Sequence, residues 1–299
     1  MAETTVKYAE TSDLRIAYVD RGPRNGTPVI LSHGFPYDIH AYDEVTPILV
    51  EAGLRVIVPY ARGFGPTRFL SNDAKRTGQQ AARGLDIIQF ADALGLQRPI
   101  LGGFDWGGNA SCVAAALWPE RVSGLVSYAG YDIIDVAAQR RPAEPALERV
   151  CWYQHLFQSA RGRDCLDRAR DDLCRMLWQE WSPGGAFDER IFARSAAAFA
   201  NPDFVNVVIH CYRWMSGLEP GDPSLAPLED RLAQRPRIAV PAVTLDGARD
   251  PLKPGGTADH AAMFIGRHEH QLFDTGHNLP QERPDAFAGA VLNVCAWSQ

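Results

Sequence analysis

Short apolar runs alternate with amphipathic stretches along most of the chain. The runs have the length of strands that are buried on both faces of a parallel sheet. The predicted strands are 28–32, 54–59, 99–103, 122–128, 238–245 and 268–273. The predicted helices between and after them are 41–52, 77–94, 109–117, 257–264 and 284–297. An alternating stretch at 4–20 predicts an antiparallel hairpin in front of these elements. This order predicts βαβ units, and therefore a mostly parallel, twisted sheet flanked by helices.

The alternation of strands and helices breaks between residues 137 and 227. Within this segment the apolar pattern is helical only, and it is bordered by the linker-like 139–145 and the Gly- and Pro-rich 217–227. An insert of this length is typical of a small helical subdomain. We therefore expect an α/β core domain made of residues 1–136 and 228–299. Residues 137–227 are expected to form a helical cap, or lid, over the carboxyl edge of the sheet.

Composition narrows the class of protein. Of the 299 residues, 46% are hydrophobic and 22% are charged, as in an ordinary globular chain with a large core. The formal net charge of -6 gives no reason to expect nucleic acid or an anionic membrane as a partner. The start of the chain lacks the apolar core of a signal peptide, and no apolar run reaches the roughly 18 residues of a membrane span. We expect a cytoplasmic monomer or homodimer that binds a small molecule.

Neither the cysteines nor the histidines indicate a disulfide framework or a metal site. The six cysteines form no Cys-x-x-Cys pair and lie at positions 112, 151, 165, 174, 211 and 295. We interpret them as reduced thiols. His268 and His270 share one face of a predicted strand, but no third ligand accompanies them. We expect no metal and no cofactor.

The stretch 102–108 carries the strongest chemical signal. A buried strand ends in glycines, Asp105 stands between them and a helix follows, which is the layout of a nucleophile elbow. The glycines allow close approach, and the turn places the Asp105 side chain beside backbone N–H groups and the positive end of the helix. A carboxylate needs no base to deprotonate it, so Asp105 can attack an electrophilic carbon and form an ester. Considered alone, Asp105 is also compatible with a helix N-cap or a buried ion pair.

Two further residues follow later strands at the same edge of the sheet. Asp250 comes after the strand 238–245, and His277 comes after 268–273. A carboxylate beside an imidazole holds it in one tautomer and stabilises its charged form. We therefore hypothesise a triad of Asp105, Asp250 and His277. Taken singly, Asp250 can be a turn residue and His277 a loop histidine, and Asp132 is a second candidate for the acid.

With these residues the chain resembles α/β-hydrolases of the epoxide hydrolase and haloalkane dehalogenase group over nearly its whole length. The order of nucleophile, acid and histidine is that of the group. The motifs that carry the resemblance are His33-Gly34-Phe35-Pro36, Arg62-Gly63-Phe64-Gly65, Gly103-Phe104-Asp105-Trp106-Gly107-Gly108, the turn from Gly247 to Asp250, and Gly276-His277. The resemblance implies an α/β-hydrolase fold with an inserted cap. It also implies an oxyanion hole made by the backbone N–H groups of Phe35 and Trp106.

The resemblance also implies how the leaving oxygen is stabilised. Epoxide hydrolases carry two lid tyrosines that donate hydrogen bonds to the epoxide oxygen, and the surroundings of Tyr153 and Tyr212 look like those of that pair. Phenols are neutral at pH 7 and can give a proton to a developing alkoxide. Both side chains are also compatible with ordinary helix packing. The many lid aromatics suggest an apolar substrate. The residues expected to contact it are His33, Pro36, Trp152 and Trp214.

These features predict a hydrolase that opens an epoxide to a vicinal diol. Asp105 attacks a ring carbon, and His277, oriented by Asp250, activates water against the resulting ester. No cofactor takes part. A non-catalytic, ligand-binding member of the fold is an alternative from a different class, although all three triad residues are present.

A dehalogenase with the same nucleophile is the other alternative. Trp106 suits a halide ion, but Phe35 stands where the resemblance places a second halide ligand, often Asn. Haloacetate dehalogenases carry an arginine directly after the nucleophile, where this chain has Trp106, and position 109 is Asn. A carboxylated substrate is therefore disfavoured, and Arg213, beside Tyr212, is the residue that keeps it open.

Overall fold

A mixed sheet of nine strands forms the centre of the molecule within residues 5–298, which are the residues that the computed structural model describes. Residues 1–4 and 299 of the predicted core domain lie outside them. The strands are β1 (Lys7–Glu10), β2 (Leu14–Arg21), β3 (Pro28–Ser32), β4 (Arg55–Pro59), β5 (Arg68–Phe69), β6 (Ile100–Gly103), β7 (Gly124–Tyr128), β8 (Ala242–Gly247) and β9 (His268–Phe273). Their order is β1-β2-β4-β3-β6-β7-β8-β9, with β5 paired to β2. All pairs from β4 to β9 are parallel, whereas β2 is antiparallel to its neighbours.

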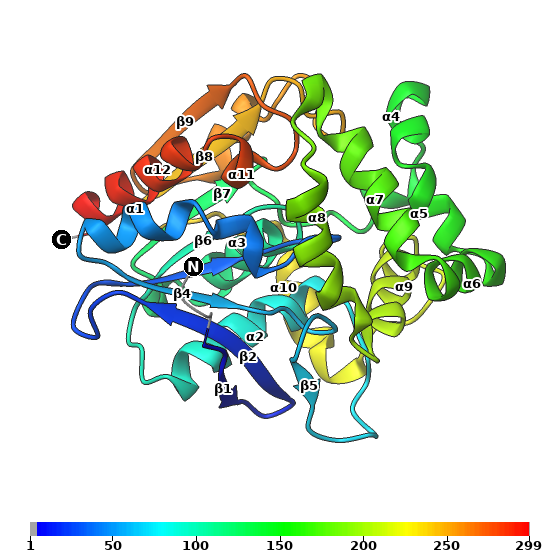
Figure 1. The fold of residues 1–299 in the computed structure, drawn as a ribbon, viewed down its shortest axis with the longest axis horizontal. Helices are drawn as coiled ribbons and strands as arrows, with labels where there is room; N and C mark the ends of the chain where they lie inside the picture. The colour runs from blue at the N-terminus through cyan, green and yellow to red at the C-terminus, as the bar shows by residue number, and fades with distance from the viewer. Residues whose placement is uncertain (1–4, 299) are drawn as a thin grey trace.

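Helices cover both faces of this sheet (Figure 1). The helices of the core are α1 (Val45–Glu51), α2 (Gln80–Ala93), α3 (Trp106–Leu117), α10 (Ala226–Ala233), α11 (Leu279–Glu282) and α12 (Pro284–Trp297). Helix α12 packs on α1, β7 and β8, while α2 and α10 pack on α3. Neighbouring residues of β3 belong to different clusters, because Val29 and Leu31 join the apolar cluster under α12, and Ile30 joins the one under α2 and α3. The alternation along a strand thus builds two cores.

The segment between β7 and β8 is helical, as the sequence predicts. It contains α4 (Pro145–Val150), α5 (Trp152–Phe157), α6 (Ala160–Arg168), α7 (Arg170–Trp181), α8 (Glu189–Ala196) and α9 (Phe204–Met215). These helices gather on one side of the molecule, on the right in Figure 1. Helices α5, α6 and α9 contact one another, whereas α10 contacts α2 and α3 of the core. The limits of the cap at 137 and 227 remain a prediction.

Several predicted boundaries are displaced. Helix α3 begins at Trp106, three residues before the predicted start, because Asp105 caps it. Strand β8 begins at Ala242, directly after Pro241, which has no N–H to donate to a ladder. The predicted helix 257–264 is a 3₁₀ helix. The 3₁₀ helices are Ile39–Tyr42, Pro119–Arg121, Ala138–Arg140, Pro183–Gly185, Ala197–Ala200, Pro223–Leu225 and Ala258–Met263.

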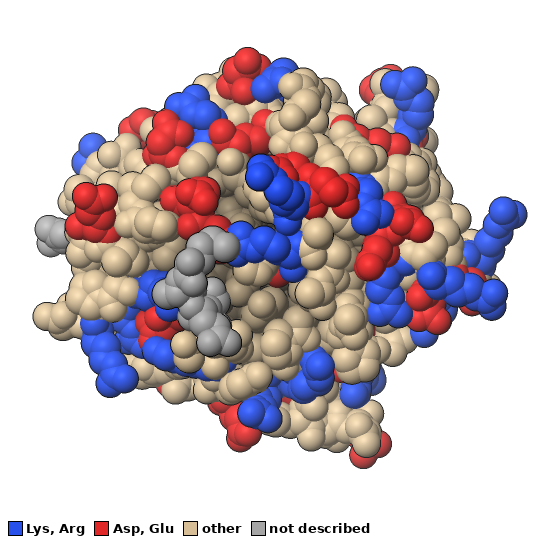
Figure 2. Space-filling model, viewed as in Figure 1, with Lys and Arg blue, Asp and Glu red and all other residues tan. Residues whose placement is uncertain are grey.

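The described residues bear on several expectations from composition. None of their helices is long and apolar enough to cross a membrane. Cys112, Cys151, Cys165, Cys174 and Cys211 are free thiols. Within residues 5–298 no cluster of three potential metal ligands is present. Acidic and basic side chains are interspersed over the face shown in Figure 2, where no broad basic surface appears.

Candidate active site

Asp105 occupies a strained position between β6 and α3. Its φ is 52° and its ψ is -131°, a conformation that costs a non-glycine residue about 1–3 kcal/mol. Two glycines make the turn possible. A Cβ on Gly103 would lie 2.3 Å from the Gly107 backbone, and one on Gly107 would lie 1.9 Å from the carbonyl oxygen of Ser32. The local sequence therefore folds into the elbow that the glycines predict, with the Asp105 side chain at its apex.

Two backbone N–H groups hold one oxygen of this carboxylate. Phe35 N and Trp106 N each donate to Asp105 Oδ1 at 2.7 Å. Gly34 permits this approach, because a Cβ there would lie 2.2 Å from Oδ1. The two donors expected for an oxyanion hole thus meet at a single oxygen, and Oδ2 is left for other partners.

His277 faces the second oxygen. Its Nε2 lies 3.3 Å from Asp105 Oδ2, and its Nδ1 lies 2.8 Å from Asp250 Oδ2. The side chains of His277 and Asp250 are buried. Asp250 also accepts the backbone N–H of Leu252 at 2.8 Å and has the Tyr128 hydroxyl at 2.9 Å. The imidazole is therefore fixed between two carboxylates, in the geometry of a nucleophile, histidine and acid.

The same contacts set the protonation of this group. Burial by itself lowers the pKa of His277, but the carboxylates of Asp250 and Asp105 outweigh burial and raise the pKa to about 10. Burial raises the pKa of Asp250, but the charge and hydrogen bond of His277 outweigh that effect and hold the pKa of Asp250 below its ordinary value. An ester at Asp105 removes one of the two carboxylate charges. Loss of that charge would lower the pKa of His277, so that a larger fraction of the imidazole would be unprotonated at neutral pH.

Asp132 does not reach the histidine. Its Oδ1 lies 3.3 Å from Lys253 Nζ, and its main-chain oxygen accepts the side-chain amide of Asn109. Of the two candidate acids, the structure brings Asp250 to His277.

A cavity of about 1270 Å³ opens above Asp105. Tyr153 of α5 and Tyr212 of α9 line it together with Trp106 and His277. The two phenol rings lie 5.4 Å apart between centroids, and both residues are buried. Burial raises the pKa of both phenols, so both are protonated at neutral pH. The structure thus brings the two predicted tyrosines to the cavity that contains Asp105.

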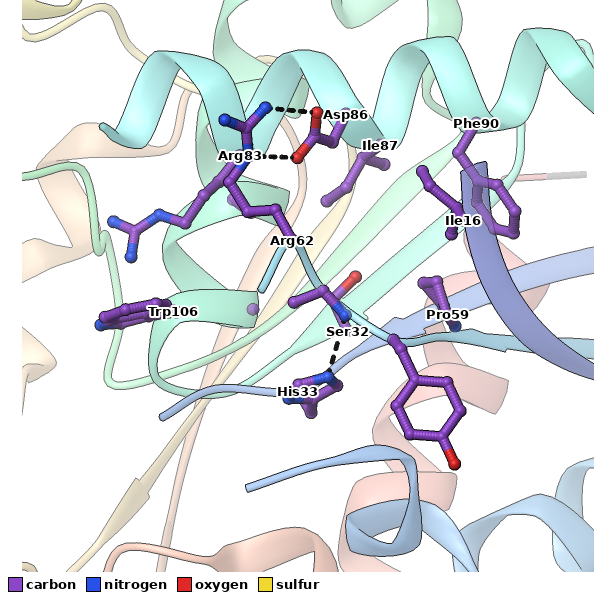
Figure 3. A pocket seen from close by; sticks show the side chains of 14 residues that line it. Ile16, Ser32, His33, Pro59, Arg62, Arg83, Asp86, Ile87, Phe90 and Trp106 are labelled. Carbon is purple, nitrogen blue, oxygen red and sulfur yellow. Dashed lines mark hydrogen bonds and ion pairs between the residues drawn. The ribbon is translucent and has the colours of Figure 1, made fainter. Parts of the chain in front are cut away.

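The four predicted substrate contacts lie elsewhere. None of His33, Pro36, Trp152 and Trp214 is among the residues that line this cavity. His33 accepts the backbone N–H of Ala61 at 3.0 Å and lines a smaller cavity beneath the elbow (Figure 3).

Two of the other three also have structural partners. The carbonyl oxygen of Pro36 accepts the indole N–H of Trp178 at 2.6 Å. Trp152 donates to Glu180 at 3.0 Å, and Trp214 is buried in α9. Pro36 and Trp152 are thus held by partners that lie far away in the sequence, which a motif cannot reveal.

Sequence reasoning missed two residues that support the triad. The Tyr128 hydroxyl lies within hydrogen-bond distance of Asp250 Oδ2 and of the carbonyl oxygen of Gly276, at 2.9 and 2.8 Å. The carbonyl oxygen of Trp181 accepts the backbone N–H of His277 at 3.0 Å, and the Trp181 ring packs on the imidazole at 5.4 Å. The position of Tyr128 at the end of β7 was an available signal, because that end points to the same sheet edge.

Arg62 of the motif 62–65 forms a buried ion pair. Its Nε and Nη2 donate to the two oxygens of Asp86 at 2.7 Å, and its Nη1 donates to the carbonyl oxygen of Thr77 at 2.9 Å. This buried pair ties the loop after β4 to α2, below the cavity that contains Asp105.

Comparisons with known proteins agree with this architecture. A family model described as the alpha/beta hydrolase fold matches residues 27–284. A solved structure of a candidate epoxide hydrolase from Klebsiella pneumoniae subsp. pneumoniae MGH 78578 is 44% identical, covers 97% of this chain and 96% of that one, and has a TM-score of 0.94. Epoxide hydrolase A of Mycobacterium tuberculosis is 24% identical over 98% of this chain and 97% of its own length.

A further relative shares one part of the chain. A haloalkane dehalogenase of Psychrobacter cryohalolentis is 39% identical over 123 residues, which are 41% of this chain and 40% of that protein. The family model spans strands β3 to β9, the elbow, Asp250 and His277. The chain therefore belongs to the alpha/beta hydrolase fold family.

Proposed function

We propose that this protein hydrolyses an epoxide to a vicinal diol through an ester on Asp105. The observation that carries the proposal is that the two oxygens of this carboxylate have different partners. Two N–H groups hold Oδ1, whereas Oδ2 faces His277 at 3.3 Å. A carboxylate held in this way is a nucleophile at Oδ2, and its carbonyl oxygen already sits where negative charge will develop.

In the first step Oδ2 of Asp105 attacks a ring carbon, and the carbon–oxygen bond of the ring breaks. The ring oxygen becomes an alkoxide and takes a proton from Tyr153 or Tyr212, which line the cavity together. The product of this step is a hydroxyalkyl ester. The protonated phenols and the closeness of their rings support this assignment.

In the second step His277 takes a proton from water, and the hydroxide attacks the ester carbonyl carbon. The N–H groups of Phe35 and Trp106 stabilise the charge on Oδ1 in the tetrahedral intermediate. Collapse of the intermediate expels the diol, which takes the proton from His277. The carboxylic acid left on Asp105 gives its proton to the tyrosinate formed in the first step, so that the carboxylate and the phenol are both restored. Asp250 keeps the imidazole in the required tautomer.

Displacement of a halide is the second candidate reaction. One observation favours it, because the indole Nε1 of Trp181 is buried without a hydrogen-bond partner among the described residues. The Trp181 ring contacts both His277 and Tyr153. An indole N–H is a donor that suits a halide ion. The relatives named haloalkane dehalogenases agree with this alternative.

A direct assay separates these reactions. The wild-type protein is incubated with aryl and alkyl epoxides, haloalkanes and haloacetates, and diol and free halide are measured in parallel, with Asp105→Ala as the blank. Diol without halide supports the proposal. Halide without diol favours the second candidate. No product from any substrate contradicts both and favours a ligand-binding member of the fold.

A further inference from the structure

Arg83 is a buried arginine on the wall of the cavity that contains Asp105. It comes from α2, it is 4% exposed, and it lines this cavity beside Trp106 and Asn109. Figure 3 shows its guanidinium over the indole of Trp106, with the central carbon 4.7 Å from the ring. Phe35 stacks on the same indole with its ring 5.6 Å away.

The hydrogen bonds of Arg83 are few and neutral. Its Nη2 donates to Asn109 Oδ1 at 2.9 Å, and its Nη1 lies 3.6 Å from the sulfur of Cys211. Its Nε is buried with no partner among the described residues. A guanidinium carries five N–H donors, so most of those of Arg83 are unused.

Arg83 also has no counter-charge at ion-pair distance among residues 5–298, whereas the other buried or half-buried charges on the cavity wall do. Those pairs are Asp105 with His277 at 3.3 Å, Asp132 with Lys253 at 3.3 Å, Asp135 with Arg235 at 3.9 Å, and Glu148 with His155 at 2.7 Å. The remaining cations of the wall, Arg140 and Arg141, are exposed to solvent. Arg83 is therefore the buried cation of this wall that forms no ion pair among the described residues, although its charge also acts on the carboxylates of Asp86, Asp132 and Glu229.

Arg62 provides an internal comparison. It lines the smaller cavity of Figure 3 together with Arg83 and is equally buried, yet it makes a two-point ion pair with Asp86. Burying a charge without a partner costs several kcal/mol, so a purely structural arginine is paired, as Arg62 is. Arg83 instead presents a fork of donors, oriented by Asn109 and the Trp106 ring, to the cavity of the nucleophile.

We propose that Arg83 binds a carboxylate on the substrate, so that the preferred substrate is an epoxide that carries a carboxylate near the ring. The inference rests on the proposed function and names its substrate class. The fork of a guanidinium matches the two oxygens of a carboxylate. Repulsion from Asp105 is offset because that carboxylate is paired with His277. The sequence has no arginine at positions 106 and 109 and left Arg213 as the candidate cation, whereas Arg83 and not Arg213 lines the cavity.

The test compares 3-phenylglycidate with 3-phenylglycidamide, which replaces the carboxylate by a neutral amide of nearly the same shape. For the wild type we expect kcat/KM to favour the carboxylate. In Arg83→Gln we expect the ratio of the two kcat/KM values to fall about 30- to 100-fold, mainly through KM of the carboxylate, because a buried charge-assisted contact is lost. Arg83→Lys retains the charge but not the fork, and we expect an intermediate ratio.

Two controls make the result specific. Arg140→Gln removes an exposed positive charge from the rim of the same cavity, and we expect it to change the ratio less than threefold. Thermal unfolding of each variant shows whether it is folded. Because the readout is the ratio of the kcat/KM values for two substrates, a smaller fraction of active protein affects both values equally and leaves the ratio unchanged. An unchanged ratio in Arg83→Gln, or an equal fall in Arg140→Gln, overturns the inference.

Two further measurements distinguish a failure of this inference from a failure of the proposed function. One uses styrene oxide, a neutral epoxide, and the other uses phenylacetate and phenylacetamide, which carry no epoxide. If styrene oxide is hydrolysed but the wild type shows no preference for the carboxylate, the substrate class is wrong and the proposed function stands. If no epoxide is hydrolysed, the proposed function fails, and calorimetry with phenylacetate and phenylacetamide decides about Arg83. Tighter binding of phenylacetate by the wild type, lost in Arg83→Gln, supports the anion site, and equal binding overturns it.

Discussion

Replacing His277 by glutamine is expected to separate the two proposed chemical steps. Attack by Asp105 needs no general base, because the nucleophile is already a carboxylate, so the ester should still form. Hydrolysis of the ester needs a base for water, and a general base contributes about 10²- to 10⁴-fold, or about 2.7–5.5 kcal/mol of activation free energy. We therefore expect the ester to accumulate in this variant while the diol forms slower by that factor.

We expect this variant to fold. Removal of one partner of a buried ion pair costs up to about 3–5 kcal/mol, because the remaining charge is left without compensation. Asp250, however, keeps the backbone N–H of Leu252 at 2.8 Å and the hydroxyl of Tyr128 at 2.9 Å. Glutamine is also close to histidine in size and carries an amide that can donate to Asp250. The loss of stability should therefore lie below that upper figure.

The assay is rapid quenching followed by intact-mass measurement. We expect a species heavier than the protein by the mass of one epoxide, approaching one equivalent per site, and no such species when Asp105→Ala is added to the same variant. Peptide mapping should place the adduct on Asp105. In wild-type protein, one turnover in oxygen-labelled water should leave the diol unlabelled and place the label in the carboxylate of Asp105.

The mechanism would be refuted by diol formation at the wild-type rate in His277→Gln. It would also be refuted if the variant consumed the epoxide without any adduct on Asp105. A label in the diol of the first turnover would mean that water, and not the carboxylate, attacks the ring.

Further predictions concern the other groups of the site. Tyr153→Phe and Tyr212→Phe should each slow ester formation about 10- to 100-fold. Each change removes a hydrogen bond to the developing alkoxide, which contributes about 1.5–3 kcal/mol. Stopped-flow or rapid-quench measurements of ester formation test this. The rate of ester hydrolysis should rise with pH, because His277 must lose its proton to act as a base. The midpoint should lie below about 10, since ester formation removes one of the charges that raise the pKa of His277. In Asp250→Asn that midpoint should move to lower pH and hydrolysis should slow by on the order of 10²-fold or more. Gly34→Ala should lower activity more than about 10²-fold and stability by about 1–3 kcal/mol, because its Cβ would lie 2.2 Å from the Asp105 carboxylate. Gly289→Ala is the control, since the space around its Cβ is open, and it should change neither activity nor stability.

The local sequence was sufficient to predict the elbow and the chain order of the candidate triad residues. The glycines around Asp105 predict a close turn because a Cβ at Gly103 or Gly107 meets backbone atoms, which is a property of the segment itself and of the strand beside it. Asp250 and His277 could be assigned to one edge because the ends of parallel strands share it. Helix boundaries were less certain, because caps and 3₁₀ turns depend on single hydrogen bonds, such as the one from Trp106 N to Asp105.

Partners that come from distant segments could be decided only by the tertiary structure. Asp132 and Asp250 both follow strands, and only the packing of the loops shows that Lys253 holds the first and His277 the second. The motif around His33 suggested a substrate contact, yet the loop after β4 supplies the N–H that its side chain accepts.

Arg83 shows most clearly what a sequence pattern leaves open. In the sequence it is one polar residue on an amphipathic helix. Its closeness to Trp106 and Asn109 follows from the packing of α2 on α3, which brings together side chains that are more than twenty positions apart in the chain. Residue spacing fixes which side chains share a strand or a helix face, and so the sequence by itself determined the fold class and the candidate triad. Which charges face one cavity, and which of them lack a partner, depends on the sum of many weak contacts between elements, and only the folded structure decided it.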